Sequence, residues 1–208
     1  MLQGLDYALD QARQAGVRVI LVLSDYFASG AGGPDQYLSF VDPPPCGAPP
    51  CSRDLFWSNA QAKAYYKAYA EKVLTRVNSI NGRAYSADPT VFGIDLMNEP
   101  RCQSPAACYT DPGDASTPVI AAWVEEMAAY VRTLDSIHPV TVGLDGFYTE
   151  GAGTDPSVQP YSTAGAETNA DFNLVSKFVD FAEFNVYPDL YNRVRSGGEA
   201  GRQGRQSP

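Results

Sequence analysis

Four short apolar runs, each preceded by a stretch of helical spacing, dominate the pattern of hydrophobic and polar positions along the chain. The runs occupy residues 17–23, 90–97, 139–147 and 179–186. The first of them, VRVILVL, is rich in β-branched residues and almost uninterrupted by polar ones, which is typical of a strand buried on both faces of a parallel sheet. The pattern therefore predicts four buried strands.

The stretches before these runs repeat their apolar residues every three to four positions, which predicts helices over residues 5–15, 58–80, 119–135 and 170–177. Gly16 is placed to end the first helix, Ser58 to cap the second, and Thr117 with Pro118 to begin the third. Residues 24–56 contain many glycines and prolines and are expected to form a long loop after the first strand.

Helices and strands that alternate in this way predict an α/β fold with parallel strands and right-handed crossovers. The candidates are an open doubly wound sheet and a (β/α)8 TIM barrel. No Gly-x-Gly-x-x-Gly turn follows a predicted strand, which weighs against the nucleotide-binding open sheet. A full barrel takes about 250 residues and eight strands, so this interpretation implies a partial barrel of four consecutive βα units. We expect that domain over residues 1–190 and a disordered tail over residues 191–208.

Composition narrows the range of partners. The chain has 208 residues, 44% of them hydrophobic and 19% charged, with a net charge of −9. An acidic surface disfavours nucleic acid and anionic membranes, and no apolar run is long enough to span a bilayer. No signal-peptide pattern is visible in this sequence. One His and four Cys in these spacings fit none of the usual zinc sites, so we expect neither a metal nor a cofactor.

The sequence Asp95-Leu96-Met97-Asn98-Glu99-Pro100-Arg101-Cys102 carries the strongest chemical signal. It places the carboxyl group of Glu99 and the amide of Asn98 where a buried strand ends, and glycoside hydrolysis needs a carboxylic acid that protonates the leaving oxygen. Asn98 could bind a sugar hydroxyl. The alternative is that Asn-Glu-Pro is an ordinary turn at a strand end.

The wider sequence resembles glycoside hydrolase family 5, specifically the plant and fungal type of endo-β-1,4-mannanase. The resemblance is carried by YYKAYAEKVLTRVNSINGRAYSADPTVFGIDLMNEPRC, WVEEMAAYVRTLDSIHPVTVGLDGFY and VDFAEFNVYPD, and it covers residues 4–189 in the expected order. It implies a (β/α)8 barrel, of which these four strands would be the third to the sixth. It also implies retaining endo-hydrolysis of β-1,4-mannosidic bonds by two carboxylates.

Site residues follow from the same resemblance. Glu99 matches the acid/base carboxyl, Asn98 the amide that contacts the sugar, and Tyr187 a tyrosine near the nucleophile. Arg101 matches a residue of the cleft, although a structural ion pair is an equal alternative. The family usually has His-x-Tyr where this chain has Asn185-Val186-Tyr187, and an amide can donate a hydrogen bond but cannot carry a proton at neutral pH.

The family's nucleophile is a Glu on the following strand, and these 208 residues contain no match to that strand. The other carboxyl groups near strand ends, Asp145, Glu150 and Glu183, are poor substitutes. Asp95 is expected to be a buried carboxylate with a cationic partner. We therefore expect the chain as given to be an incomplete and inactive enzyme. The alternatives are a non-catalytic remnant that binds polysaccharide weakly, and another family 5 β-glycanase such as a cellulase.

The four cysteines form two close pairs, Cys46 with Cys51 and Cys102 with Cys108. An even number in short loops suits disulfides in a secreted protein, and four free thiols are the alternative. The resemblance further implies secretion, a monomer, and mannan or glucomannan as the polysaccharide partner.

Overall fold

A four-stranded parallel sheet lies at the centre of the chain, in the order β1-β2-β3-β4. The structure is a computed structural model, and it describes residues 2–27, 32–47, 51–102, 107–108, 110, 118–144, 175 and 177–185. The strands are β1 (Val19–Val22), β2 (Val91–Asn98), β3 (Val140–Leu144) and β4 (Glu183–Phe184). The helices are α1 (Leu2–Ala15), α2 (Pro34–Ser39), α3 (Ala60–Leu74) and α4 (Val119–Leu134), with short 3-10 turns η1 (Arg53–Phe56) and η2 (Tyr85–Ala87).

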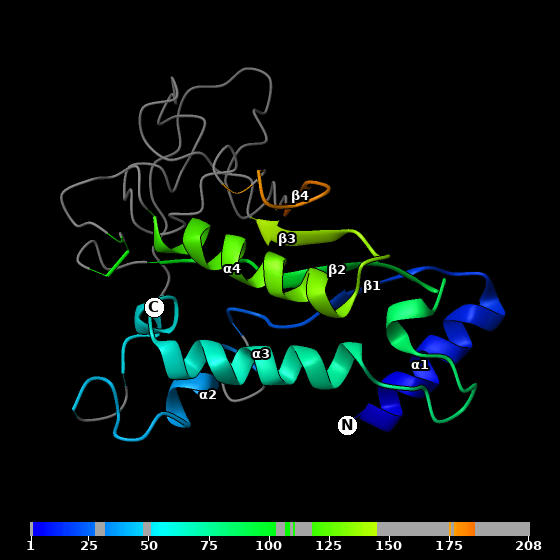
Figure 1. The fold of residues 1–208 in the computed structure, drawn as a ribbon, viewed down its shortest axis with the longest axis horizontal. Helices are drawn as coiled ribbons and strands as arrows, with labels where there is room; N and C mark the ends of the chain where they lie inside the picture. The colour runs from blue at the N-terminus through cyan, green and yellow to red at the C-terminus, as the bar shows by residue number, and fades with distance from the viewer. Residues whose placement is uncertain are drawn as a thin grey trace, which may run out of the picture.

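The alternation of helix and strand predicted from the sequence is confirmed. Figure 1 shows α3 and α4 side by side across one face of the sheet, with α1 crossing near one end. Gly16 ends α1 with a φ of 69°, and the N–H of Val17 donates to the carbonyl of Ala12. Glycine suits this position because a left-handed conformation costs it little.

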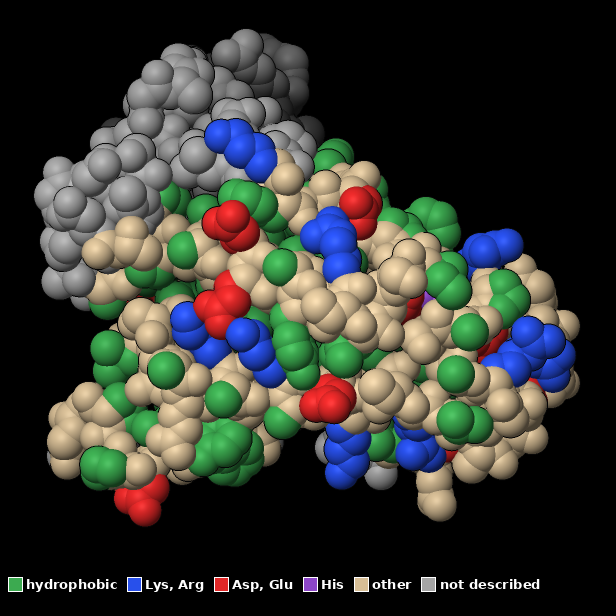
Figure 2. All heavy atoms as spheres, in the orientation of Figure 1, with side chains coloured by type: hydrophobic (Ala, Val, Ile, Leu, Met, Phe, Trp, Pro, Cys, Tyr) green, Lys and Arg blue, Asp and Glu red, His purple; other side chains and the backbone are tan. Residues whose placement is uncertain are grey.

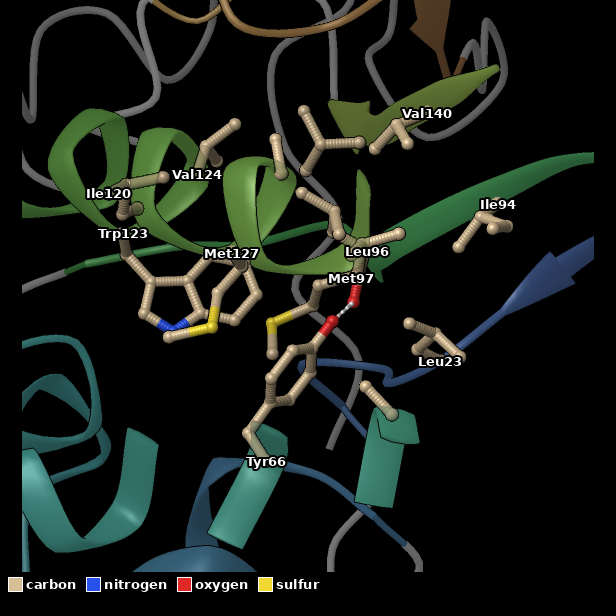
Figure 3. Packing of buried hydrophobic residues seen from close by; sticks show 14 of the residues in the cluster. Leu23, Tyr66, Ile94, Leu96, Met97, Ile120, Trp123, Val124, Met127 and Val140 are labelled. Atoms are coloured by element: carbon tan, nitrogen blue, oxygen red, sulfur yellow. Dashed lines mark hydrogen bonds between the residues drawn. The ribbon is translucent and has the colours of Figure 1, made fainter. Parts of the chain in front are cut away.

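The core between the sheet and its covering helices is rich in aromatic side chains. Tyr66 of α3 and Trp123 of α4 are in contact, with ring centroids 5.0 Å apart, and both are almost completely buried. The hydroxyl of Tyr66 donates to the backbone carbonyl of Leu96 at 2.7 Å (Figure 3). This bond satisfies a polar group inside the core, as a buried tyrosine requires, and it fixes α3 against the strand that leads to Glu99.

The other face of β1 is open. Leu21 and Leu23 are buried in the core, whereas Ile20 and Val22 are 38% and 51% exposed. Successive strand residues point to opposite faces, so Ile20 and Val22 lie on the face turned away from the helices. β1 also hydrogen-bonds to β2 alone among the described strands. Among the described residues, this apolar face of β1 is therefore left partly exposed to solvent.

The second helix is shorter than the sequence pattern predicts. α3 ends at Leu74 and not near residue 80, because the following residues bind Asp6 of α1. Arg76 forms an ion pair with the buried Asp6 carboxylate, and Ser79 and Tyr85 each donate a hydroxyl to it at 2.7 Å. These tertiary bonds outweigh the local preference for helix.

Two further expectations need correction. Asn59, and not Ser58, caps α3 by accepting the N–H of Ala62 at 2.9 Å, because Ser58 still lies in the turn that follows η1. The segment 24–56 is not a plain loop, since it contains α2 and η1. Most of the predicted helix over 170–177, and the whole of the predicted tail over 191–208, lie outside the described residues.

The solvent side of the helices carries charges of both signs, which are interspersed over the face shown in Figure 2. Glu126 of α4 binds Lys63 and Lys67 of α3 at 2.7 and 2.6 Å. Within the described residues, no helix has the length and apolar character needed to cross a membrane.

The Asp6 cluster yields a prediction about stability. We expect Asp6→Asn to lower the free energy of unfolding by about 3 kcal/mol, because it leaves a buried network without its charge. The control Asp35→Asn removes a half-exposed ion pair with Arg53 and should cost much less. Chemical denaturation of the two variants measures both effects, and equal losses would contradict the prediction.

The same cluster sets the sign of the pH dependence. The hydrogen bond from Arg76, with those from Ser79 and Tyr85, holds the pKa of Asp6 well below its usual range despite burial. Its contribution to stability is therefore present above the unfolded value of about 3.9 and is lost as the pH falls towards the folded value. In Asp6→Asn that part of the acid sensitivity should disappear.

Candidate active site

The ends of three strands bring polar side chains together at the carboxyl edge of the sheet. Asn98 is the last residue of β2, Glu99 follows it, and Asn185 directly follows β4. Asp25, just beyond β1, forms a parallel bridge with Asn98. In parallel α/β folds this edge is where functional side chains gather.

The backbone at Glu99 turns sharply as β2 ends. Its φ is 46°, a left-handed conformation that non-glycine residues adopt at a cost of about 1 kcal/mol. Its N–H donates to the carbonyl of Gly143 in β3 at 2.7 Å, and the residue is 7% exposed. The turn therefore continues the pairing of β2 with β3 by one more bond while changing the direction of the chain.

Each oxygen of the Glu99 carboxyl group has a partner from a different segment. The side-chain amide of Asn185 donates to Oε1 at 2.9 Å, and a guanidinium nitrogen of Arg101 lies 3.6 Å from Oε2. The same Asn185 nitrogen also reaches Oδ1 of Asn98 at 3.2 Å. Asn98 in turn donates to Oδ2 of Asp25 at 3.4 Å. A chain of polar contacts thus runs across the ends of β1, β2 and β4.

Arg101 is held in place by two contacts besides its ion pair. Its guanidinium lies over the ring of Phe27, 4.8 Å from the centroid, and its carbonyl accepts the indole N–H of Trp57 at 3.1 Å. Cation–π contact and ion pairing can act together on one planar guanidinium. The arrangement presents a cation beside the Glu99 carboxyl group.

Both expected disulfides are present. Cys102 and Cys108 are bonded with Cα atoms 5.6 Å apart, directly after Arg101, and Cys46 is bonded to Cys51 with Cα atoms 5.5 Å apart. Asp54 lies close to the sulfurs of Cys102 and Cys108. Because those sulfurs are bonded to each other, they offer no thiolate to a metal ion.

Asp95 lies in the interior of the sheet before Glu99, and its surroundings differ from those expected. No described Lys, Arg or His nitrogen pairs with it. Its Oδ1 instead accepts the backbone N–H groups of Gly143 and Met97, each at 3.0 Å. Burial and the neighbouring charge of Glu183 raise the pKa of Asp95 to about 7. Among the described residues the predicted cationic partner is not found, and backbone donors take its place.

A family model described as GH family 5 beta-mannosidase-like matches residues 1–181 of the chain. The chain belongs to glycoside hydrolase family 5. Among its relatives, mannan endo-1,4-beta-mannosidase 4 of Oryza sativa subsp. japonica is 39% identical over 191 residues. Mannan endo-1,4-beta-mannosidase 7 of Arabidopsis thaliana is 35% identical over 189 residues. The matches cover 92% and 91% of this chain but only 39% and 41% of the relatives' own lengths.

Solved structures agree with this placement in family 5. The endo-β-1,4-mannanase from Thermotoga petrophila matches with a TM-score of 0.75 and 29% identity, over 91% of this chain and 38% of that one. The endo-1,4-beta-mannanase from Rhizomucor miehei matches with a TM-score of 0.74 and 27% identity, over 93% of this chain and 50% of that one. The four strands and their helices are therefore part of a TIM barrel.

The structure brings together four of the five site residues predicted from the sequence of this family 5 chain, namely Asn98, Glu99, Arg101 and Asn185. The fifth, Tyr187, lies outside the described residues, as do Asp145 and Glu150.

Sequence reasoning missed three contributors, Asp25, Phe27 and Gly143. Asp25 had a usable signal, since it follows a buried strand as Glu99 does. Gly143 and Phe27 had none, because their roles depend on contacts between distant segments.

Gly143 provides a test of how tightly the site is built. A Cβ atom there would lie 3.0 Å from Oε1 of Glu183, 3.1 Å from Oδ2 of Asp95 and 3.2 Å from Cα of Asn98. We expect Gly143→Ala to destabilise the chain by about 2 kcal/mol. Gly4→Ala, in α1 with open space around it, should instead stabilise by about 0.5 kcal/mol. Denaturant titration distinguishes them, and a neutral Gly143→Ala would contradict the packing argument.

Proposed function

We propose that this chain carries the acid/base side of the catalytic centre of a retaining endo-β-1,4-mannosidase, with Glu99 as the proton donor. One observation carries the proposal. The Glu99 carboxyl group lies at the carboxyl edge of the sheet, nearly buried, with a separate partner for each of its oxygens. Membership of family 5 and the names of the relatives support the reaction and the substrate class.

The contacts of the Glu99 carboxyl group indicate which of its two oxygens would carry the transferable proton. Asn185 donates to Oε1, so that oxygen is an acceptor and the transferable proton belongs on Oε2. Glu99 would give this proton to the glycosidic oxygen as the bond breaks, and would later take one from the attacking water. Arg101, 3.6 Å from Oε2, would stabilise the carboxylate left between the two steps.

A retaining mechanism also needs a nucleophilic carboxylate about 5–5.5 Å from the acid. The family resemblance places that Glu on a strand after Tyr187, to which these 208 residues contain no match. We therefore propose that the acid and the nucleophile come from different parts of a longer polypeptide. Asn98, Arg101 and Tyr187 would contact the sugars on the acid side.

The proposed substrate is mannan or glucomannan, bound by a monomer that works outside the cell. The two disulfides support this location, because such bonds persist in oxidising compartments.

The first test uses the 208-residue polypeptide by itself. We expect no release of reducing sugar from mannan, glucomannan or cellulose, because one carboxyl group cannot be both nucleophile and acid. Binding to mannan without hydrolysis would fit a remnant that only binds polysaccharide. Turnover that Glu99→Gln abolishes would show that a nucleophile lies within these residues and would contradict the prediction.

The second test places Glu99 in a complete enzyme. In a chimera, residues 1–189 replace the matching segment of the rice mannan endo-1,4-beta-mannosidase 4. We expect Glu99→Gln to lower kcat/KM on mannan by at least about 100-fold, whereas Glu125→Gln, the same change on the exposed face of α4, should have little effect. A Glu99→Gln chimera with full activity would overturn the acid/base assignment, and a preference for cellulose would overturn the substrate.

A further inference from the structure

Two carboxyl groups, those of Asp95 and Glu183, lie close to the same point beside Gly143 inside the sheet. Oδ2 of Asp95 and Oε1 of Glu183 both lie within 3.1 Å of the point where a Cβ atom on Gly143 would stand. Glycine is what allows the two groups to approach, because any side chain at residue 143 would separate them. Asp95 is fully buried, and its Oδ2 has no hydrogen-bond partner; the same holds for the buried Oε2 of Glu183.

The surroundings offer this pair no positive charge. From the segment that follows β1 comes Asp25, which adds a further negative charge. From α3 comes the hydroxyl of Tyr66, which donates to Leu96. From β3 come only Thr141, whose hydroxyl donates to the carbonyl of Phe181, and the backbone of Gly143. No described Lys, Arg or His forms an ion pair with either carboxyl group.

Two neighbouring carboxylates without a cation, one fully buried and one half-buried, are costly, and one bound proton removes most of that cost. We propose that Asp95 and Glu183 bind one proton between them, as a carboxylic acid and a carboxylate, and that this neutralised pair holds Gly143 where the backbone of Glu99 requires it. The proton gives one acid an O–H donor and leaves the other group as its acceptor, so it can provide the unpartnered Oδ2 of Asp95 with a hydrogen bond.

The link to Glu99 runs through a single residue. Oδ1 of Asp95 accepts the N–H of Gly143 at 3.0 Å, and the carbonyl of Gly143 accepts the N–H of Glu99 at 2.7 Å. Gly143 is also the register partner of Glu183. Asp95 is therefore a positioning residue for Glu99. The consequence for catalysis rests on the proposed function, whereas the pairing itself does not.

The pair also predicts the direction of a pH effect. Burial, followed by the charge of Glu183, raises the pKa of Asp95, and burial raises that of Glu183. A group with a raised folded pKa contributes stability that is complete below its unfolded value and is lost as the pH rises through its folded value. The wild-type chain should therefore lose stability between about pH 4 and about pH 7.

The experiment uses the 208-residue chain and needs no hydrolysis, so its outcome is independent of the proposed activity. Urea unfolding is measured at pH 5 and pH 8 for the wild type, Asp95→Asn, Glu183→Gln and Asp95→Ala. In the wild type we expect the unfolding equilibrium constant to rise at least about tenfold at pH 8. Asp95→Asn keeps an acceptor for Gly143 and gains a donor for Glu183, so it should remove that rise.

Glu183→Gln should also remove the rise of the unfolding equilibrium constant at pH 8, because it removes the repelling charge and offers Asp95 an amide donor. Asp95→Ala has no oxygen to accept the N–H groups of Gly143 and Met97. It should therefore be less stable than Asp95→Asn at either pH. NMR chemical shifts distinguish proton binding from a purely structural role, because they report the titration of the pair directly. The carboxyl carbon of Asp95 should titrate near neutral pH, and the amide signals of Gly143 and Glu99 should follow it in the wild type but not in Asp95→Asn.

Three results would overturn the proposal. The first is an Asp95 carboxyl group that titrates in the ordinary range near pH 4. The second is an unchanged pH dependence of unfolding in both Asp95→Asn and Glu183→Gln. The third is a Glu99 amide signal that stays constant while Asp95 titrates, which would break the link to the candidate acid even if the shared proton exists.

Discussion

The hydrogen bond from the Glu99 N–H to the carbonyl of Gly143 is the contact on which the rest of the site depends. It is formed by the backbone, so no side chain has to be ordered to make it, and it fixes a residue whose φ of 46° the chain would otherwise avoid. A strained conformation persists only where its surroundings determine it. Here they do so through the pairing of β2 with β3, which the buried core beneath α3 and α4 stabilises.

Much of the fold could be predicted from the sequence because local pattern and final structure agree. Predominantly apolar runs became β1, β2 and β3, and Gly16 ended α1 as its lack of a side chain suggested. The errors came where distant residues decide the outcome. α3 stops at Leu74 because Arg76 binds Asp6, a partner 70 positions away, and no local signal reveals such a pair.

The site residues fall into the same two groups, those that a local motif reveals and those whose role depends on contacts between distant segments. Glu99, Asn98 and Arg101 could be found because they form one motif at the end of one strand. Asn185 could be named only as a departure from the family pattern, and its contact with Glu99 depends on how β4 lies beside β3. Gly143 could not be found, since its importance comes from the absence of a side chain between Asp95 and Glu183. Such a requirement becomes visible only when the neighbouring strands are in place.

The amide at Asn185 changes the character of the site. An imidazole in its place could gain or lose a proton near neutral pH, whereas an amide N–H donates at every pH. The donor that Asn185 offers to Oε1 of Glu99 therefore does not change with pH. The same nitrogen contacts Oδ1 of Asn98. Asn185 cannot titrate, so it adds no charge to this part of the sheet. The electrostatics around Glu99 then depend on Asp25, Asp95 and Glu183, balanced by Arg101 from outside the sheet.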